Sequence, residues 1–228
     1  MRFLFCTLAN ITLISFCKSL YILNHYPFLI YVEDYNSRIM STKKLELNLT
    51  VRPLTPDLLP ALTDLFGTQG PVAQCWCMYW RIGNDYRKRP AEANKADFYE
   101  LVKNNPPIGL LAFSGDLAVG WCQLTPRDAL PHLDKTWRLK RVDDKPVWSI
   151  SCFYIRKGWR KKGVTSVLIT AALDAARKAG APALEAYPLD ADLSPSASGT
   201  GFASTFEKLG FKVVARHFPP RPIMRYEF

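Results

Sequence analysis

The stretch Val147-Trp-Ser-Ile-Ser-Cys-Phe-Tyr-Ile155 leads into Arg156-Lys-Gly-Trp-Arg-Lys-Lys-Gly163 and then into an apolar-periodic segment that ends near Ala179. Its β-branched and aromatic residues predict a strand over 147–155. Apolar residues then recur at helical spacing, and Gly180 stands where the end of a helix favours left-handed backbone. Residues 183–187, Ala-Leu-Glu-Ala-Tyr, predict a second strand. The stretch therefore predicts a strand, a basic glycine turn, a helix and a strand.

The chemistry that this turn offers is anion binding. A helix N-terminus presents unpaired backbone N–H groups and a partial positive charge, and a glycine just before it lets a phosphate approach the backbone closely. Arg160, Lys161 and Lys162 add positive charge, and Thr165 and Ser166 add hydroxyl groups. A basic, solvated turn without a ligand is the plainer alternative, and the glycine pattern alone does not decide between the two.

Two motifs in this half of the chain resemble the GNAT N-acetyltransferase superfamily. Arg160-Lys-Lys-Gly163-Val-Thr165 is similar to the acetyl-CoA signature of that family, and Thr165 departs from the glycine or alanine found there. Phe206-Glu-Lys-Leu-Gly-Phe211 is similar to its Tyr-x-Lys-x-Gly-Phe element, with Phe206 in place of the tyrosine. The resemblance spans residues 48 to 228 and implies an α/β fold, with a mixed, mostly antiparallel twisted sheet and helices on both faces.

The resemblance also implies the activity: direct transfer of an acetyl group from acetyl-CoA to a primary amine in a ternary complex. The pantetheine arm would lie between the two strands where they part, and the pyrophosphate would lie on the turn. The cofactor-binding residues implied in this way are Cys152, Phe153, Tyr154, Ile155, Arg160, Lys161, Lys162, Gly163, Val164, Thr165, Ser166 and Phe206. Strand alternation predicts that Ser149, Ser151, Phe153 and Ile155 share one face and that Trp148, Ile150, Cys152 and Tyr154 share the other.

The catalytic residues follow the family pattern less closely. The place where many relatives carry a glutamate base falls near Ser149, which is a poor base. Glu185 is the alternative base, because a carboxylate among apolar neighbours would have a raised pKa suited to amine deprotonation; a salt bridge is the other interpretation of this residue. Tyr187 and Ser204 are the candidates for protonating the leaving thiolate. These departures support a rival hypothesis, a non-catalytic acyl-CoA-binding or regulatory protein on the same fold.

The segment Gln74-Cys-Trp-Cys-Met-Tyr-Trp-Arg81 crowds aromatic residues, cysteines and a cation together. One hypothesis is an acceptor pocket, with Trp76 and Trp80 as its walls and Arg81 as the anchor for an anionic group; a buried wedge between helices is the alternative. The run resembles a bacterial-type subset of GNAT proteins with Cys-Trp-Cys-Met-x-Trp-Arg. A cysteine nucleophile is a minor option, and the cysteine and histidine spacing predicts no metal site.

The remaining pattern predicts a single domain. An edge strand over 45–53 precedes a helix that begins at Thr55-Pro56-Asp57 and ends at Gly67. The further predicted elements are a helix over 90–104, a hairpin of strands 108–113 and 117–124 about Ser114-Gly115-Asp116, a charged loop over 125–145, a helix over 202–209, and strands over 211–215 and 224–228 joined by an extended proline crossover. In the charged loop, His132 is expected to be a solvated histidine, and a role as a base is the alternative.

The chain has 228 residues, a net charge of +10 and scattered positive charge, and no nucleic-acid-binding pattern. Residues 1–39 form an apolar extension, and the acetyltransferase domain is expected over 40–228. A dispensable segment upstream of a start at Met40 is the first interpretation of that extension, and a membrane anchor or a secretion signal are the alternatives. We expect a cytoplasmic protein that meets a membrane only if the extension is an anchor. The sequence leaves the acceptor amine and the oligomeric state open, a homodimer included.

Overall fold

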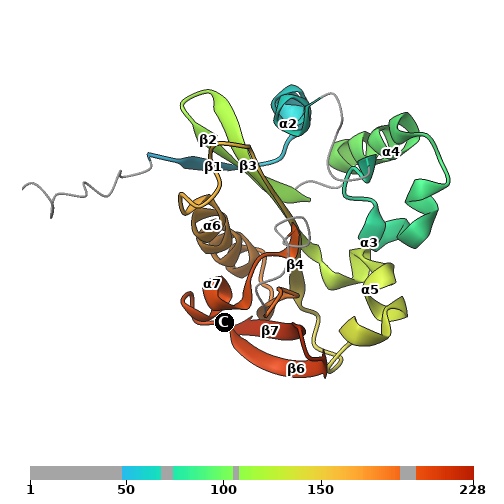
Figure 1. The fold of residues 1–228 in the computed structure, drawn as a ribbon, viewed down its shortest axis with the longest axis vertical. Helices are drawn as coiled ribbons and strands as arrows, with labels where there is room; N and C mark the ends of the chain where they lie inside the picture. Colours follow the sequence, from blue (N-terminus) through green and yellow to red (C-terminus); the bar gives the residue numbers. More distant parts are fainter. Residues whose placement is uncertain (1–47, 68–73, 105–107, 191–198) are drawn as a thin grey trace, which may run out of the picture. The chain divides into compact units, whose positions relative to one another are not determined.

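The computed structural model describes residues 48–67, 74–104, 108–190 and 199–228. The strands form one seven-stranded sheet in the order β1-β2-β3-β4-β5-β7-β6, in which β4 and β5 are parallel and the other neighbours are antiparallel (Figure 1). The strands are β1 (Thr50–Pro53), β2 (Gly109–Ser114), β3 (Leu117–Pro126), β4 (Trp148–Ile155), β5 (Ala183–Ala186), β6 (Lys212–Phe218) and β7 (Arg221–Glu227). The predicted mixed, mostly antiparallel sheet is therefore confirmed, and β1 lies at its edge as expected.

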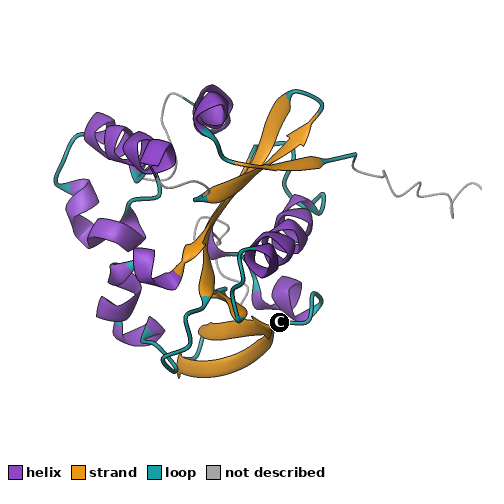
Figure 2. Ribbon diagram, turned by 180° about the vertical axis from the view of Figure 1, so that it is seen from behind, coloured by secondary structure: helices purple, strands orange, loops and turns teal. Residues whose placement is uncertain are grey.

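Helices cover both faces of this sheet (Figures 1 and 2). The α-helices are α2 (Leu59–Phe66), α3 (Tyr79–Ile82), α4 (Ala91–Asn104), α5 (Pro131–Lys135), α6 (Val164–Lys178) and α7 (Ala203–Glu207), and the 3-10 turns are η1 (Pro56–Leu58), η3 (Gly83–Arg87), η4 (Arg127–Ala129) and η5 (Trp137–Leu139). The apolar side of α6 packs with β2 to β5 in one buried cluster, and α2 and α4 pack with the opposite face in a second cluster. The chain passes from the end of β4 at Ile155 to the start of α6 at Val164 through one short turn, so these two ends lie near each other.

Local sequence signals predicted several elements correctly. The hairpin about Gly115 is present, and the helix after the glycine turn begins at Val164 and ends at Lys178. Gly67 and Gly180 have positive φ angles of 69° and 75°, which fits their predicted positions at helix ends. The helix signal at Thr55 is displaced, because residues 56–58 form a 3-10 turn before α2 and Thr55 makes no side-chain cap.

The predicted alternation along β4 is wrong beyond Ile150, because the strand contains a β-bulge. Gln123 on β3 pairs with Cys152 while Leu124 pairs with Ile150, which leaves Ser151 as an extra residue on β4. As a result, Ile150 and Phe153 both pack in the α6-side cluster, and Cys152 packs on the opposite side. A period-2 pattern cannot show such an insertion.

The segment after β3 is not the predicted charged loop. It forms η4, α5 and η5, and its Leu130, Leu133 and Leu139 are buried against the sheet. These leucines form a third cluster with Tyr187 and Ile223. The proline crossover prediction is also wrong, because β6 and β7 form a tight hairpin in which Phe218 pairs with Arg221.

Candidate functional site

The glycine turn places a set of free backbone donors at the start of α6. Gly163 precedes the helix and has a φ of +87°. The first hydrogen bond of the helix runs from the Val167 N–H to the Gly163 carbonyl. The N–H groups of residues 164–166 precede that bond and so lack intrahelical partners. Arg160, Lys161 and Lys162 are exposed around them. The turn therefore presents backbone donors and positive charge to solvent together.

Close packing against β3 fixes the position of this helix end. A Cβ atom on Gly120 would lie 2.7 Å from Val164 Cγ1 and 3.1 Å from Leu168 Cδ1, so only glycine lets the first turn of α6 approach the strand this closely. Val164 and Leu168 are buried in the α6-side cluster. The helix end is thus held by the sheet rather than by the exposed turn.

The parallel strands β4 and β5 separate halfway along β4. Their pairing ends at Ile150 and Ala186, while β4 continues to Ile155. The Arg156 N–H bonds to Val119 on β3, so by strand alternation Tyr154 also faces β3, and the backbone groups of Phe153 and Ile155 face the other way. Beyond Ile150 this edge of β4 has no strand partner among the described residues. We call it the open edge of β4.

The open edge and the glycine turn are continuous, because Ile155 leads directly into Arg156. Arg160 Nε donates to the Ile155 carbonyl at 3.2 Å, which draws the turn back onto the strand end. Phe206 is fully buried and packs near this part of β4. Its ring centroid is 6.2 Å from that of Phe153. Ser204, on the same short helix α7, is exposed.

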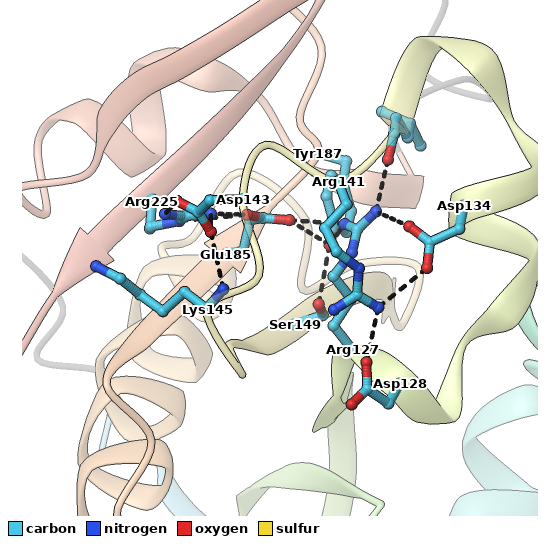
Figure 3. Close-up of polar contacts among 11 residues, drawn as sticks. Arg127, Asp128, Asp134, Arg141, Asp143, Lys145, Ser149, Glu185, Tyr187 and Arg225 are labelled. Carbon is cyan, nitrogen blue, oxygen red and sulfur yellow. Dashed lines mark hydrogen bonds and ion pairs between the residues drawn. The ribbon is translucent and has the colours of Figure 1, made fainter.

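Glu185 lies at the centre of a buried ionic network (Figure 3). Its Oε1 accepts hydrogen bonds from Arg127 Nη1 at 2.7 Å and from the Tyr187 hydroxyl at 2.8 Å. Its Oε2 accepts from Arg225 Nε at 3.3 Å and Nη2 at 2.9 Å. Both oxygens accept hydrogen bonds and two guanidinium groups contact the carboxylate, so the geometry favours the salt-bridge interpretation of Glu185.

The network continues outward from both arginines. Arg127 Nη2 bonds to Asp134 at 2.7 Å and to the Leu139 carbonyl at 2.6 Å, while Arg225 bonds to Asp143 at 2.7 Å. Sequence reasoning missed Arg127 and Arg225. Arginine is seldom fully buried, and nothing in the local pattern distinguishes Arg127 from the other charges after β3.

Tyr187 is buried with its hydroxyl inside this network. The hydroxyl oxygen lies 2.6 Å from Arg127 Nη1 and 2.9 Å from Ser149 Oγ. Burial raises the pKa of Tyr187 well above its usual value, and the neighbouring Glu185 charge raises it further. Ser149, near which the family resemblance implied a glutamate base, is therefore a partner of Tyr187 within the protein interior.

The aromatic segment 74–81, which ends within α3, does not form one pocket wall. Trp76 is buried in the α2–α4 cluster, with its ring centroid 5.3 Å from that of Phe66. Trp80 lies against the third cluster and donates from Nε1 to the Ser151 carbonyl at 3.1 Å. Arg81 Nη1 donates to the Ala129 carbonyl at 3.0 Å. Of these candidates, Trp80 is the residue that contacts β4 at its bulge.

The backbone of this segment is unusual. Gln74, Trp76 and Cys77 all have positive φ, at 57°, 42° and 58°, a conformation that non-glycine residues seldom adopt. Burial raises the pKa of Cys75 to about 12, and a hydrogen bond with Cys152, together with burial, raises that of Cys77. Neither thiol is suited to act as a nucleophile.

His132 does not lie in a loop. It is on α5, half-buried, with its ring centroid 5.1 Å from that of Tyr79. Within the described ranges, no three histidine, cysteine or acidic residues lie close enough together to hold a metal ion. No helix among those same residues is both long and apolar enough to cross a membrane.

Comparison with known proteins identifies the family. The model of the acetyltransferase (GNAT) family matches residues 73–211, and the chain belongs to that family. No curated protein matches the chain. Similar solved structures include PaiA N-acetyltransferase from Thermoplasma acidophilum in complex with coenzyme A, at 15% identity and a TM-score of 0.47, covering 79% of this chain and 99% of that one. YncA from Salmonella typhimurium with acetyl-CoA is 16% identical with a TM-score of 0.47, covering 78% and 93% of the two chains.

Proposed function

We propose that the protein transfers an acetyl group from acetyl-CoA to a primary amine. The observation that carries the proposal is the open edge of β4, which leads without interruption into the free N–H groups at the start of α6. The membership in the acetyltransferase family supports the same conclusion. The separated strands, the glycine turn and the basic side chains together suit a long ligand with amide groups at one end and phosphates at the other.

The pantetheine arm would pair with the open edge as an additional strand, through the backbone groups of Phe153 and Ile155. The pyrophosphate would lie on the N–H groups of Val164, Thr165 and Ser166, with Arg160, Lys161 and Lys162 around it. Gly163 lets the phosphate reach these donors. Cys152 and Tyr154 belong to the same strand, β4, and Phe206 packs against Phe153 of that strand.

In the reaction, the amine nitrogen attacks the thioester carbonyl carbon, the carbon–sulfur bond breaks, and coenzyme A leaves as its thiol. A backbone N–H at the bulge of β4 would stabilise the negative charge on the carbonyl oxygen. The amine would lose its proton to water, because Glu185 is fully engaged by Arg127 and Arg225. Ser204 is the exposed hydroxyl on α7 that remains as a donor to the thiolate, and Tyr187 would act by holding Ser149.

The acceptor would approach over the segment that carries Trp80, which touches β4 at Ser151. We propose Trp80 and Arg81 as acceptor-side residues, and Trp76 as a support for them from the neighbouring cluster. The Cys-Trp-Cys-Met segment would then mark a subset of the family that shares this acceptor side.

The test is turnover of acetyl-CoA with a panel of primary amines, with free coenzyme A measured by chromatography and the acetylated product by mass spectrometry. We expect coenzyme A release that depends on the amine and that yields an equal amount of product. Tight binding of acetyl-CoA without turnover on any amine would instead support a non-catalytic acyl-CoA-binding protein. The occupied Glu185 and the phenylalanine at 206 are the observations that favour this second candidate.

A further inference from the structure

Two half-buried arginines, Arg138 and Arg221, have no carboxylate partner in the described part of the chain. The two fully buried arginines of the ionic network do have one: Arg127 bonds to Glu185 and Arg225 to Asp143. Arg138 Nε is buried without a hydrogen-bond partner among the described residues. A buried cation without a counter-charge is costly unless a ligand supplies that charge.

Both arginines lie at the end of the β6–β7 hairpin. Arg138 is part of η5, and its guanidinium carbon lies 5.4 Å from the centroid of the Phe218 ring. Phe218 pairs directly with Arg221, the first residue of β7. Strand alternation puts Arg221 on the same face of β7 as Ile223, which packs with Leu139 in the third cluster. Both side chains therefore lie about the same hairpin end.

Their charges act on each other. Burial and the positive charge of Arg138 both lower the pKa of Arg221, and the Tyr79 side chain opposes that effect. Two guanidinium groups so placed repel each other, and an anion between them would relieve the repulsion.

This arginine pair lies at the end of the molecule where β4 and β5 separate. Arg221 Nη1 donates to the Tyr187 carbonyl at 3.0 Å and to Thr200 Oγ1 at 2.8 Å. Tyr187 directly follows β5, whose last pair with β4 is Ala186 with Ile150. Trp80 reaches β4 just past the same point, at Ser151, and packs against the third cluster. The arginine pair and Trp80 thus both lie near the start of the open edge.

We propose that Arg138 and Arg221 bind an anionic group, a carboxylate or a phosphonate, carried by the amine acceptor. This assignment rests on the proposed acetyl transfer. Guanidinium groups suit both anions, since they offer paired donors in a plane. Arg81 also lacks a carboxylate partner among the described residues, but it stands alone: its Nη1 donates to the Ala129 carbonyl, and no other described arginine acts on its charge. The acceptor is therefore an amino acid or a similar compound that carries both an amine and an acid.

The first experiment measures anion binding directly. The full chain is saturated with coenzyme A, so that phosphate cannot occupy the glycine turn, and is titrated with acetate and then with inorganic phosphate while NMR follows the amide signals of Arg138 and Arg221. We expect saturable shifts in the wild type, at least tenfold weaker binding in Arg138→Gln, and loss of binding in the Arg138→Gln/Arg221→Gln double variant.

Arg177→Gln is the matched control, since it removes the same charge from an exposed position at the end of α6. It should bind both anions as the wild type does. Arg138→Gln alone keeps the test valid if Arg221 is needed for folding, because Arg138 makes no hydrogen bond to any described residue. No saturable binding in the wild type, or equal binding in the wild type and Arg138→Gln, would overturn the assignment. A failure to bind coenzyme A would instead argue against the proposed transferase.

The second experiment compares acceptors. Amino acids, their uncharged amides and the matching aminophosphonates are assayed side by side with acetyl-CoA. We expect the acids to be at least tenfold better in kcat/KM than the amides, and Arg221→Gln to raise KM for the acids only; the phosphonates show which of the two anions fits. Equal use of acids and amides would contradict the inference while leaving the acetyl transfer itself established.

Discussion

Glu185 is a carboxylate that lies between two arginines, and its role is decided by those partners. With both oxygens occupied and an exposed fraction of 1%, it holds β5 to β7 through Arg225 and to η4 through Arg127. Removing one member of a buried ion pair leaves the other charge uncompensated. The residue is therefore expected to matter for stability.

We expect Glu185→Gln to lower the free energy of unfolding by about 3–5 kcal/mol, because two buried guanidinium groups lose their common counter-charge. Urea unfolding followed by circular dichroism measures the change. Glu207→Gln, at an exposed position on α7, is the control and should stay within about 0.5 kcal/mol of the wild type. If Glu185→Gln were as stable as the wild type but inactive, Glu185 would be the general base after all.

The buried Tyr187 hydroxyl makes the stability of the protein depend on pH in the alkaline range. Its pKa is higher in the folded protein than in the unfolded chain, so the folded state holds the proton more tightly. Its contribution to stability is therefore complete below the unfolded pKa of about 10 and is lost as the pH rises toward the folded value.

Above pH 10 the wild type should lose stability more steeply than Tyr187→Phe, by about 1.4 kcal/mol for each pH unit. Urea unfolding of both proteins at a series of alkaline pH values measures the two slopes. Parallel slopes would show that the Tyr187 hydroxyl is not held protonated by its surroundings.

At the scale of the elements, the approach of α6 to β3 depends on one glycine. We expect Gly120→Ala to weaken acetyl-CoA binding and Gly120→Val to weaken it further, by at least tenfold in total, because each added methyl group pushes Val164 and the helix end away from the strand. Titration calorimetry measures the affinities, and circular dichroism checks that the variants fold. Unchanged affinity in Gly120→Val would show that the position of this helix end is not critical.

The elements also show how far the sequence could predict the structure. The helix after the glycine turn, the hairpin about Gly115 and the edge strand follow from local periodicity and turn residues, and all three were predicted. The bulge at Ser151 and the buried helices between β3 and β4 were not. Both depend on contacts with distant strands, as the pairing of Ile150 with Leu124 and the burial of Leu133 show.

In the candidate site, too, the local features were predicted and the long-range ones were not. The glycine turn is a local motif, and the sequence predicted its position. The ionic network and the arginine pair join residues far apart in the chain, such as Arg127 with Glu185 and Arg138 with Phe218, so no spacing rule could have found them.

For the molecule as a whole, we propose that residues 40–228 contain the complete acetyltransferase domain. The segment Glu46–Phe228 forms a compact unit of its own. A chain that begins at Met40 should unfold in one transition, with a free energy of unfolding and an acetyl-CoA affinity equal to those of the full chain. Lower stability or weaker binding of the shorter chain, measured by urea unfolding and calorimetry, would show that the first 39 residues contribute to the fold or to the site.

The central claim is that the glycine turn and the open edge of β4 bind acetyl-CoA. Titration calorimetry of the full chain with acetyl-CoA, beside Gly163→Trp and Gly158→Trp, tests it most directly. Both glycines have a positive φ, of 87° and 89°, so both variants place a side chain in a backbone conformation that favours glycine, but only Gly163 adjoins the free N–H groups of α6. We predict saturable binding that Gly163→Trp loses and Gly158→Trp keeps. A folded wild type that does not bind acetyl-CoA, or a Gly163→Trp variant that binds it equally well, would contradict the claim.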